Sequence, residues 1–140
     1  MDLGQLSAGV VMGIAAIGSG IGICTAGQAS VGAWKRCFLN NKPAPMVLIT
    51  FAGAPLTQIF YGFILMGSIA KSAKPGEFLL GLGVVSGLAL AISAVVQGKV
   101  AAAAADAQGE TGKGFAQYIA VVGICETVAL FAMVLSMVSC

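Results

Sequence analysis

The stretch that decides the fold is Phe115–Cys140, FAQYIAVVGICETVALFAMVLSMVSC, which is apolar or uncharged except for one acid, Glu126. It is long enough to cross a bilayer as a helix, which needs about 20 mostly apolar residues. Glu126 lies near the middle of the stretch, where a charged side chain costs roughly 2.5–3.5 kcal/mol on insertion scales. Such a residue is kept neutral by a proton, a cation or a partner, and it commonly marks an ion path. The simpler alternative is a protonated acid that only hydrogen-bonds a neighbouring helix.

The composition is that of a multi-pass membrane protein. Of the 140 residues, 59% are hydrophobic and 9% are charged, and the mean hydropathy is +1.00, whereas soluble domains carry about 25% charged residues. The net charge of +2 is too small to indicate nucleic acid as a partner. The N-terminus begins MDLGQ without a basic run, so we expect no signal peptide there and a first helix that stays in the mature protein.

The sequence therefore predicts an all-α membrane fold with four transmembrane helices. The expected helices are Leu6–Trp34, Met46–Ala70, Phe78–Ala105 and Phe115–Cys140, separated by breaks that contain proline, glycine and polar residues. We expect a single membrane domain over residues 1–140. Residues 1–70 would form a first helical hairpin, and residues 71–140 a second hairpin that carries Glu126.

The two hairpins read as copies of one another. Gly9–Gly13 (GVVMG) matches Gly83–Gly87 (GVVSG). The matching offset of roughly seventy residues places Gln58 opposite Glu126. A hairpin is thus predicted to have been duplicated, with an acid in one copy and an amide in the other. An amide is neutral at every pH, so the first copy can bind an ion but cannot titrate.

Basic residues set the expected orientation in the membrane. Five of them lie in or beside the loops 35–45 and 106–114, namely Lys35, Arg36, Lys42, Lys99 and Lys113. Only Lys71 and Lys74 lie in the loop between the second and third helices. Because cytoplasmic loops carry the excess of Lys and Arg, we expect loops 35–45 and 106–114 to be cytoplasmic and both termini to lie outside.

The first predicted helix carries a stripe of glycines spaced close to whole turns. Its members are Gly9, Gly13, Gly20 and Gly27, and Gly18 and Gly22 add a GxxxG pair. Small residues let membrane helices approach closely. Because a four-helix chain has little interior volume, we expect the stripe to pack against another copy of the chain. Tight packing inside one chain is the alternative.

Polar side chains gather near Pro55 in the second predicted helix. Pro55 lacks a backbone N–H and disturbs the turn before it, so carbonyls of that turn can face an ion or water. The polar set, drawn from three helices, is Thr57, Gln58, Tyr61, Gln97 and Glu126. One carboxylate with amide and hydroxyl oxygens suits a monovalent cation such as Na⁺ better than a divalent ion. Alternatively these groups only hydrogen-bond between helices, and a proton carrier would need fewer of them.

We find no sequence pattern of an enzyme. There is no nucleotide-binding motif, no nucleophile with a base and no pair of carboxylates, so the chain is predicted not to be catalytic by itself. The rival function is a small four-helix proton-coupled drug antiporter. Such antiporters carry their membrane Glu in the first helix with aromatic residues around it, whereas this first helix lacks acids and aromatics before Trp34. A purely structural membrane scaffold is a third hypothesis.

Three segments are the most specific: Pro55–Phe63 (PLTQIFYGF), Gln97–Ala103 (QGKVAAA) and Glu126-Thr127. With them, and over its whole length, the chain resembles the proteolipid (K or c-type) subunit of V-type and prokaryotic V/A-type rotary ATPases. The resemblance implies that the carried ion is bound by Thr57, Gln58, Gln97 and Glu126. It further implies that a backbone carbonyl near Ala54 completes the site and that Tyr61 locks Glu126.

The same resemblance implies how the protein works. Identical copies would form a ring that turns in the lipid bilayer against a static membrane subunit of the a or I type. Central-stalk subunits would contact loops 35–45 and 106–114. Each copy would carry one Na⁺ or H⁺ at Glu126, with no other cofactor, coupled to ATP hydrolysis or synthesis on other subunits. The expected location is a prokaryotic cell (inner) membrane, and both ions fit the sequence.

Overall fold

The computed structural model describes residues 2–140 as helices joined by short loops. The elements are α1 (Leu3–Leu39), α2 (Leu48–Gly53), the 3-10 turn η1 (Ala54–Leu56), α3 (Thr57–Lys71), α4 (Gly76–Thr111) and α5 (Phe115–Ser139). Because α2, η1 and α3 follow one another along one axis, residues 2–140 contain four helical segments long and apolar enough to cross a membrane. The predicted all-α fold with four membrane helices is confirmed.

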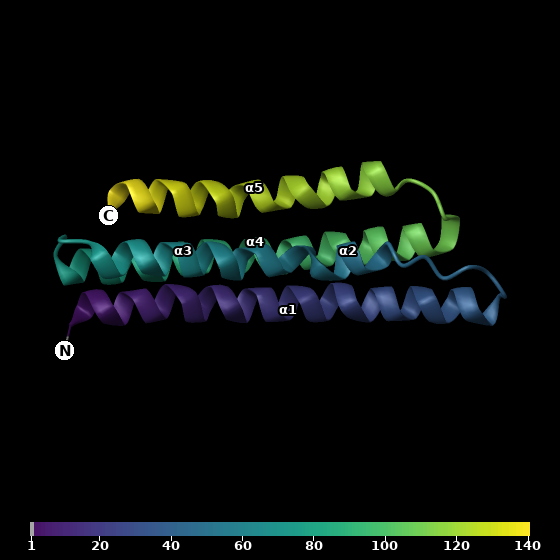
Figure 1. The fold of residues 1–140 in the computed structure, drawn as a ribbon, viewed down its shortest axis with the longest axis horizontal. Coiled ribbons are helices and arrows are strands. Elements are labelled where there is room, and N and C mark those ends of the chain that lie inside the picture. Colours follow the sequence, from purple (N-terminus) through teal and green to yellow (C-terminus); the bar gives the residue numbers. More distant parts are fainter. Residues whose placement is uncertain (1) are drawn as a thin grey trace.

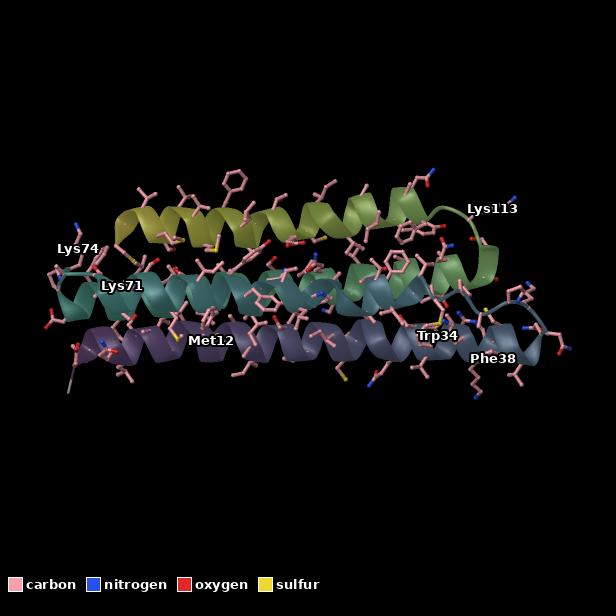
Figure 2. The ribbon with its side chains drawn as sticks, in the orientation of Figure 1. Met12, Trp34, Phe38, Lys71, Lys74 and Lys113 are labelled. Carbon is pink, nitrogen blue, oxygen red and sulfur yellow. The ribbon has the colours of Figure 1, made fainter. Side chains whose placement is uncertain are left out.

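Figure 1 shows the helices lying lengthwise in one bundle. In that view α1 runs along one side, α5 runs along the other, and α2–α3 overlaps α4 between them. The two ends of the bundle differ in their side chains: Figure 2 places Lys71 and Lys74 at one end, and Trp34, Phe38 and Lys113 at the opposite end. Lys71, Lys74 and Lys113 therefore lie at the ends of the membrane-length helices.

Helices α1 and α4 extend past the ends that the sequence predicted, Trp34 and Ala105. Residues 35–39 and 106–111, which we expected in loops, continue the two helices. The physical reason is that the extensions lie side by side, with Arg36 of α1 in an ion pair with Asp106 of α4. Helix α4 ends only where Gly112 turns the chain at φ 66°, a left-handed conformation that glycine adopts without strain.

The first helices of the two predicted repeats, α1 and α4, run parallel and in contact along their length. Hydrogen bonds join residues 72 positions apart near both ends of this contact. Near the N-terminus the Ser7 hydroxyl donates to the Leu79 carbonyl. Near the other end the Cys37 thiol donates to the Gly109 carbonyl, with a sulfur–oxygen distance of 3.4 Å. The bonded pairs are thus within two residues of positions that correspond in the predicted repeat, whose offset here is 74.

Glycine lets these two backbones touch. A Cβ on Gly18 would lie 2.2 Å from Cα of Ala91, and a Cβ on Gly98 would lie 2.4 Å from Cα of Gly22. Distances this short exclude any side chain at these positions. The GxxxG pair of α1 is therefore the part of the glycine pattern that holds the chain together internally.

The predicted glycine stripe of α1 lies on a face of the helix that does not pack against the rest of the described chain. Its members are Gly9, Gly13, Gly20 and Gly27, and a Cβ on any of them would meet no atom of the described chain within 4 Å, apart from its own helix backbone and chain neighbours. Packing inside one chain, the alternative that the sequence left open, therefore does not use this stripe. Its packing against a second copy stays a prediction.

Candidate ion-binding site

The interruption of the second membrane helix opens the site. Pro55 has no N–H to give to the helix, and residues 54–56 form a 3-10 turn in which the Thr57 N–H bonds the Ala54 carbonyl. The Thr57 hydroxyl donates to the same carbonyl at 3.2 Å. The turn thereby places two oxygens, one from the backbone and one from a hydroxyl, at the depth of Pro55.

Two buried amides continue from this turn into α4. Gln58 and Gln97 are both 0% exposed. Nε2 of Gln58 donates to Oε1 of Gln97 at 2.8 Å, and Oε1 of Gln58 accepts from the Thr57 hydroxyl at 3.2 Å. Nε2 of Gln97 donates to the Val122 carbonyl at 3.0 Å. Because a carbonyl oxygen can only accept, the nitrogen of Gln97 must face α5, and its oxygen must face Gln58.

The carboxyl group of Glu126 lies at the outer end of this network. It accepts from the Tyr61 hydroxyl at Oε1 and, at 3.4 Å, from Nε2 of Gln97 at Oε2. Its side chain is only half-buried, and it borders an open pocket of about 210 Å³ between α3 and α5. The acid is thus held by donors on one side while its other side faces the surface of the chain.

The structure brings every predicted site residue into one hydrogen-bonded chain of groups. The order is Ala54, Thr57, Gln58, Gln97, Glu126 and Tyr61. Thr127, which directly follows Glu126, stays outside this network, because its hydroxyl donates to the Ile124 carbonyl of its own helix at 2.7 Å and is exposed. Among the predicted residues, the hydroxyls that do join the network are those of Thr57 and Tyr61.

One member of the network was missed at the sequence level. Ser93 of α4 is 5% exposed. Its hydroxyl donates to the Cys125 carbonyl at 2.9 Å and accepts from Nε2 of Gln58 at 3.4 Å. The available signal was spacing, since Ser93 lies four residues before Gln97 and therefore on the same helix face.

The oxygen atoms that could coordinate an ion define which ion the site can hold. It offers one carboxylate, two amide oxygens, a hydroxyl and a backbone carbonyl, all hard oxygen ligands. A single negative charge among neutral oxygens balances one monovalent cation or one proton. Residues 2–140 contain no cluster of three or more His, Cys, Asp or Glu side chains that could hold a metal ion.

Comparison with known proteins adds two findings. Residues 80–139 match the family of the ATP synthase C subunit. The A-type ATP synthase subunit K of Methanocaldococcus jannaschii is 32% identical over 137 residues, which is 96% of this chain and 60% of that protein. The chain therefore spans about three fifths of the length of the curated relative that it matches.

Four membrane-length helices within residues 2–140 support an integral, multi-pass membrane protein, and its residues 80–139 are similar to the family of ATP synthase C subunits. Within that class, the matched segment and the relative support a proteolipid subunit of the V/A type, so the resemblance drawn from the sequence is confirmed. Subunits of this family are non-catalytic, in agreement with the expectation for this chain. The same findings favour the proteolipid over the drug antiporter.

Proposed function

We propose that this chain is the ion-carrying subunit of the membrane ring of a V/A-type rotary ATPase, and that each chain carries one ion at Glu126. The observation that carries the proposal is the continuous network from the Ala54 carbonyl to the Glu126 carboxylate, which ends in an open pocket at the chain's surface. A buried network prepares the ligands, and the open side gives the ion a way in and out.

The energetics of the acid explain how such a protein works. An ionised Glu126 facing lipid would cost roughly 2.5–3.5 kcal/mol or more. With a cation or proton bound, the site is neutral and can face lipid. Where a static membrane subunit supplies water and a basic group, the ion can leave and the bare carboxylate is stabilised. Because the ion can exchange only beside the static subunit, ion flow is coupled to rotation of the ring. ATP is hydrolysed or made on other subunits.

Between the two ions, we propose Na⁺. A protonated acid needs little more than one acceptor, whereas this site gathers four further oxygen atoms from Ala54, Thr57, Gln58 and Gln97. One rearrangement goes with Na⁺ binding next to Glu126. Gln97 faces the carboxylate with its nitrogen, so its amide must rotate before its oxygen can join the ion.

Identical copies are the proposed partners of α1, and the duplication indicates how they meet. Within the chain, Gly22 of α1 touches Gly98 of α4. The repeat places Val96 at the position of Gly22, and Cys24 at the position of Gly98. If α4 of one copy meets α1 of the next as α1 meets α4 within the chain, Val96 lies against Cys24 of the neighbouring copy. Both are exposed within one chain, and the open glycine stripe lies on this same helix.

That arrangement can be tested by disulfide formation. In membranes that contain the Val96→Cys variant, mild oxidation is expected to link chains into a ladder of multimers through Cys24. The matched control is Val128→Cys, because Val128 is 62% exposed on α5, away from the proposed contact. Equal ladders from both variants, or none from Val96→Cys, would contradict the proposed neighbour contact.

The remaining partners follow from the ends of the bundle. We propose that the loops 40–47 and 112–114 and the adjoining helix ends face the cytoplasm of a prokaryotic cell and contact central-stalk subunits. At ~1.5 Å per residue, α1 and α4 are each longer than a ~30 Å hydrocarbon core, so these ends project from the bilayer. The static subunit would meet the ring on the α3–α5 side, where Glu126 borders its pocket.

The test of the ion site uses a hydrophobic carbodiimide, which modifies carboxyl groups buried in membranes. We expect modification of Glu126 in the purified oligomer, none in the Glu126→Gln variant, and slower modification as Na⁺ is raised at constant pH. Absence of any Na⁺ effect would assign the carried ion as H⁺. Retained ion transport by Glu126→Gln would refute the proposed function altogether.

A further inference from the structure

Ser93 is the point at which three helices of the site meet. Its single hydroxyl, carried by α4, donates to the carbonyl of Cys125 on α5 and accepts from the amide nitrogen of Gln58 on α3. We propose that Ser93 is a positioning residue of the ion site, which holds the Gln58 amide in its ion-binding orientation and thereby sets the affinity for the carried ion. This inference rests on the proposed function and deepens it.

The first step of the argument is the hydrogen-bond inventory of Gln58. Its amide group has two N–H donors and one oxygen, and it is 0% exposed, so each must find a partner inside the chain. One N–H goes to Oε1 of Gln97 and the other to the Ser93 hydroxyl. The oxygen is then turned toward Thr57. Ser93 is thus the acceptor for the second N–H.

The second step is that the direction of the Ser93 hydroxyl is itself determined. The Cys125 carbonyl can only accept, so the hydroxyl hydrogen of Ser93 must point to α5. The lone pairs of the hydroxyl oxygen are then left for Gln58. Without this acceptor, only the bond to Oε1 of Gln97 holds the Gln58 amide in this direction. If the amide rotates, its nitrogen instead of its oxygen faces Thr57 and the Ala54 carbonyl. A donor in that place repels a cation.

The third step concerns the acid. Cys125 directly precedes Glu126, so the bond from Ser93 ties the turn of α5 that carries the acid to the amide of Gln58. Ser93 does not touch the Glu126 carboxylate in the network described above. Its effect on the ion must therefore pass through Gln58 and through the placement of α5, which is what distinguishes a positioning residue from a ligand.

The chain supplies a matched control in Ser86. It lies seven residues before Ser93 on the same face of α4, is 4% exposed, and hydrogen-bonds Ser136 of α5 at an oxygen–oxygen distance of 2.6 Å. Its removal deletes a hydroxyl contact between the same two helices about 10 Å along the helix axis from the site. Ser86→Ala therefore measures the effect of helix packing alone.

The experiment titrates Na⁺ protection of Glu126 against a carbodiimide in purified oligomers. Ser93→Ala is expected to raise the half-protecting Na⁺ concentration about tenfold, equivalent to about 1.4 kcal/mol. Ser86→Ala is expected to change it less than twofold, and Ser93→Thr, which keeps the hydroxyl, should restore tight protection. Equal shifts for Ser93→Ala and Ser86→Ala would overturn the positioning role. If Ser93→Ala does not assemble, Ser93→Cys, with its weaker donor and acceptor, replaces it.

Different measurements test the proposed Na⁺ site and the proposed positioning role of Ser93, so one proposal can fail without the other. Wild-type Glu126 that Na⁺ never protects refutes the choice of Na⁺. The positioning role is then measured by the rate of the same modification at one fixed pH without Na⁺. Ser93→Ala, which frees the Gln58 amide and the turn of α5 that carries the acid, should change that rate several-fold, while Ser86→Ala leaves it in place. An unchanged rate in Ser93→Ala overturns the inference.

Discussion

Gln58 in the first hairpin and Glu126 in the second are predicted to occupy corresponding places in a repeat, yet their surroundings differ. Gln58 is completely buried and is hydrogen-bonded at both ends of its amide, to Thr57 of its own helix and to Gln97 of α4. Glu126 is half-buried and borders an open pocket. The neutral copy has become part of the interior, and the ionisable copy has kept its way to the surface. A group that exchanges its ion needs an opening, whereas a group that only supplies an oxygen does not.

The helices that carry the two residues differ in the same way. The first hairpin breaks its second helix at the 3-10 turn Ala54–Leu56, which exposes carbonyl oxygen to the site. Helix α5 runs without interruption through Glu126. An acid supplies its own oxygens from a regular helix, whereas the amide-bearing hairpin adds a backbone oxygen by breaking one.

The largest effect is expected when the second hairpin is made like the first. Glu126→Gln keeps the volume of the side chain and leaves no group that can ionise, so ion transport in reconstituted vesicles should be abolished while the oligomer still assembles. Glu77→Gln, which removes an exposed acid outside the network at the other end of α4 from the proposed stalk contacts, is the control and should transport normally.

The reciprocal exchange sharpens the comparison. In the double variant Gln58→Glu with Glu126→Gln, the acid lies in the fully buried position. We expect transport to remain absent, because a carboxyl group at this fully buried position has no path to an aqueous channel. Restored transport in the double variant would show that the opening beside Glu126 is dispensable.

A smaller effect is expected from removing the donor that crosses from one hairpin to the other. Tyr61→Phe deletes the hydroxyl that bonds Glu126, and hydrogen bonds to charged groups are worth about 1.5–3 kcal/mol. The ion should therefore leave at least about tenfold faster, by the arithmetic of 1.4 kcal/mol per factor of ten. Exchange of labelled Na⁺ from the purified oligomer measures this, and an unchanged exchange rate would contradict the locking role of Tyr61.

Repairing the broken helix should have two effects of opposite sign. Pro55→Ala returns a backbone N–H and keeps the Cβ that packs near Gly22. A regular helix would draw the Ala54 carbonyl back toward the Gln58 N–H, so ion affinity should fall a few-fold. The melting temperature of the oligomer should rise, because proline inside a helix costs up to about 3 kcal/mol. A Pro55→Ala variant that loses stability would contradict this account of the break.

The smallest effect is expected at the charged contact between the hairpins. Arg36 and Asp106 form an ion pair, but their side chains are 53% and 54% exposed, and such pairs are worth no more than about 1 kcal/mol. Asp106→Asn should leave ion transport unchanged and shift thermal stability only slightly. A loss of transport in this variant, with an intact oligomer, would point to a contact of this end with another subunit.

The sequence was sufficient for the four membrane helices and for choosing residues that the structure joins by hydrogen bonds, because apolar runs, one internal proline and a lone acid are local signals. That these residues bind an ion stays a prediction. It was insufficient where the signal lies in a partner distant along the chain. Residues 35–39 looked like loop, because charge and polarity mark a helix end until Asp106 is found beside Arg36. Ser93 looked like any small residue of an apolar helix.

The sequence also could not predict which of the two glycine faces of α1 packs inside the chain. Gly18 and Gly20 are equally small, and only the placement of α4 decides that the first is enclosed and the second is open. The direction of the Gln97 amide is similar, because it depends on the Val122 carbonyl of another helix. The sequence could predict that the residue type matters at these positions. It could not predict which way each glycine face or amide group points.

The amide of Gln58 also fixes how many ions the proposed motor moves in one revolution. Because only the second hairpin of each chain carries an acid at the ion site, a ring moves one ion per four helices, and each exchange advances it by the width of two hairpins. A ring of a given circumference then passes half as many ions per revolution as one with an acid in every hairpin. The energy of each ATP is divided among fewer ions, so the machine is geared to drive ions against a steeper gradient.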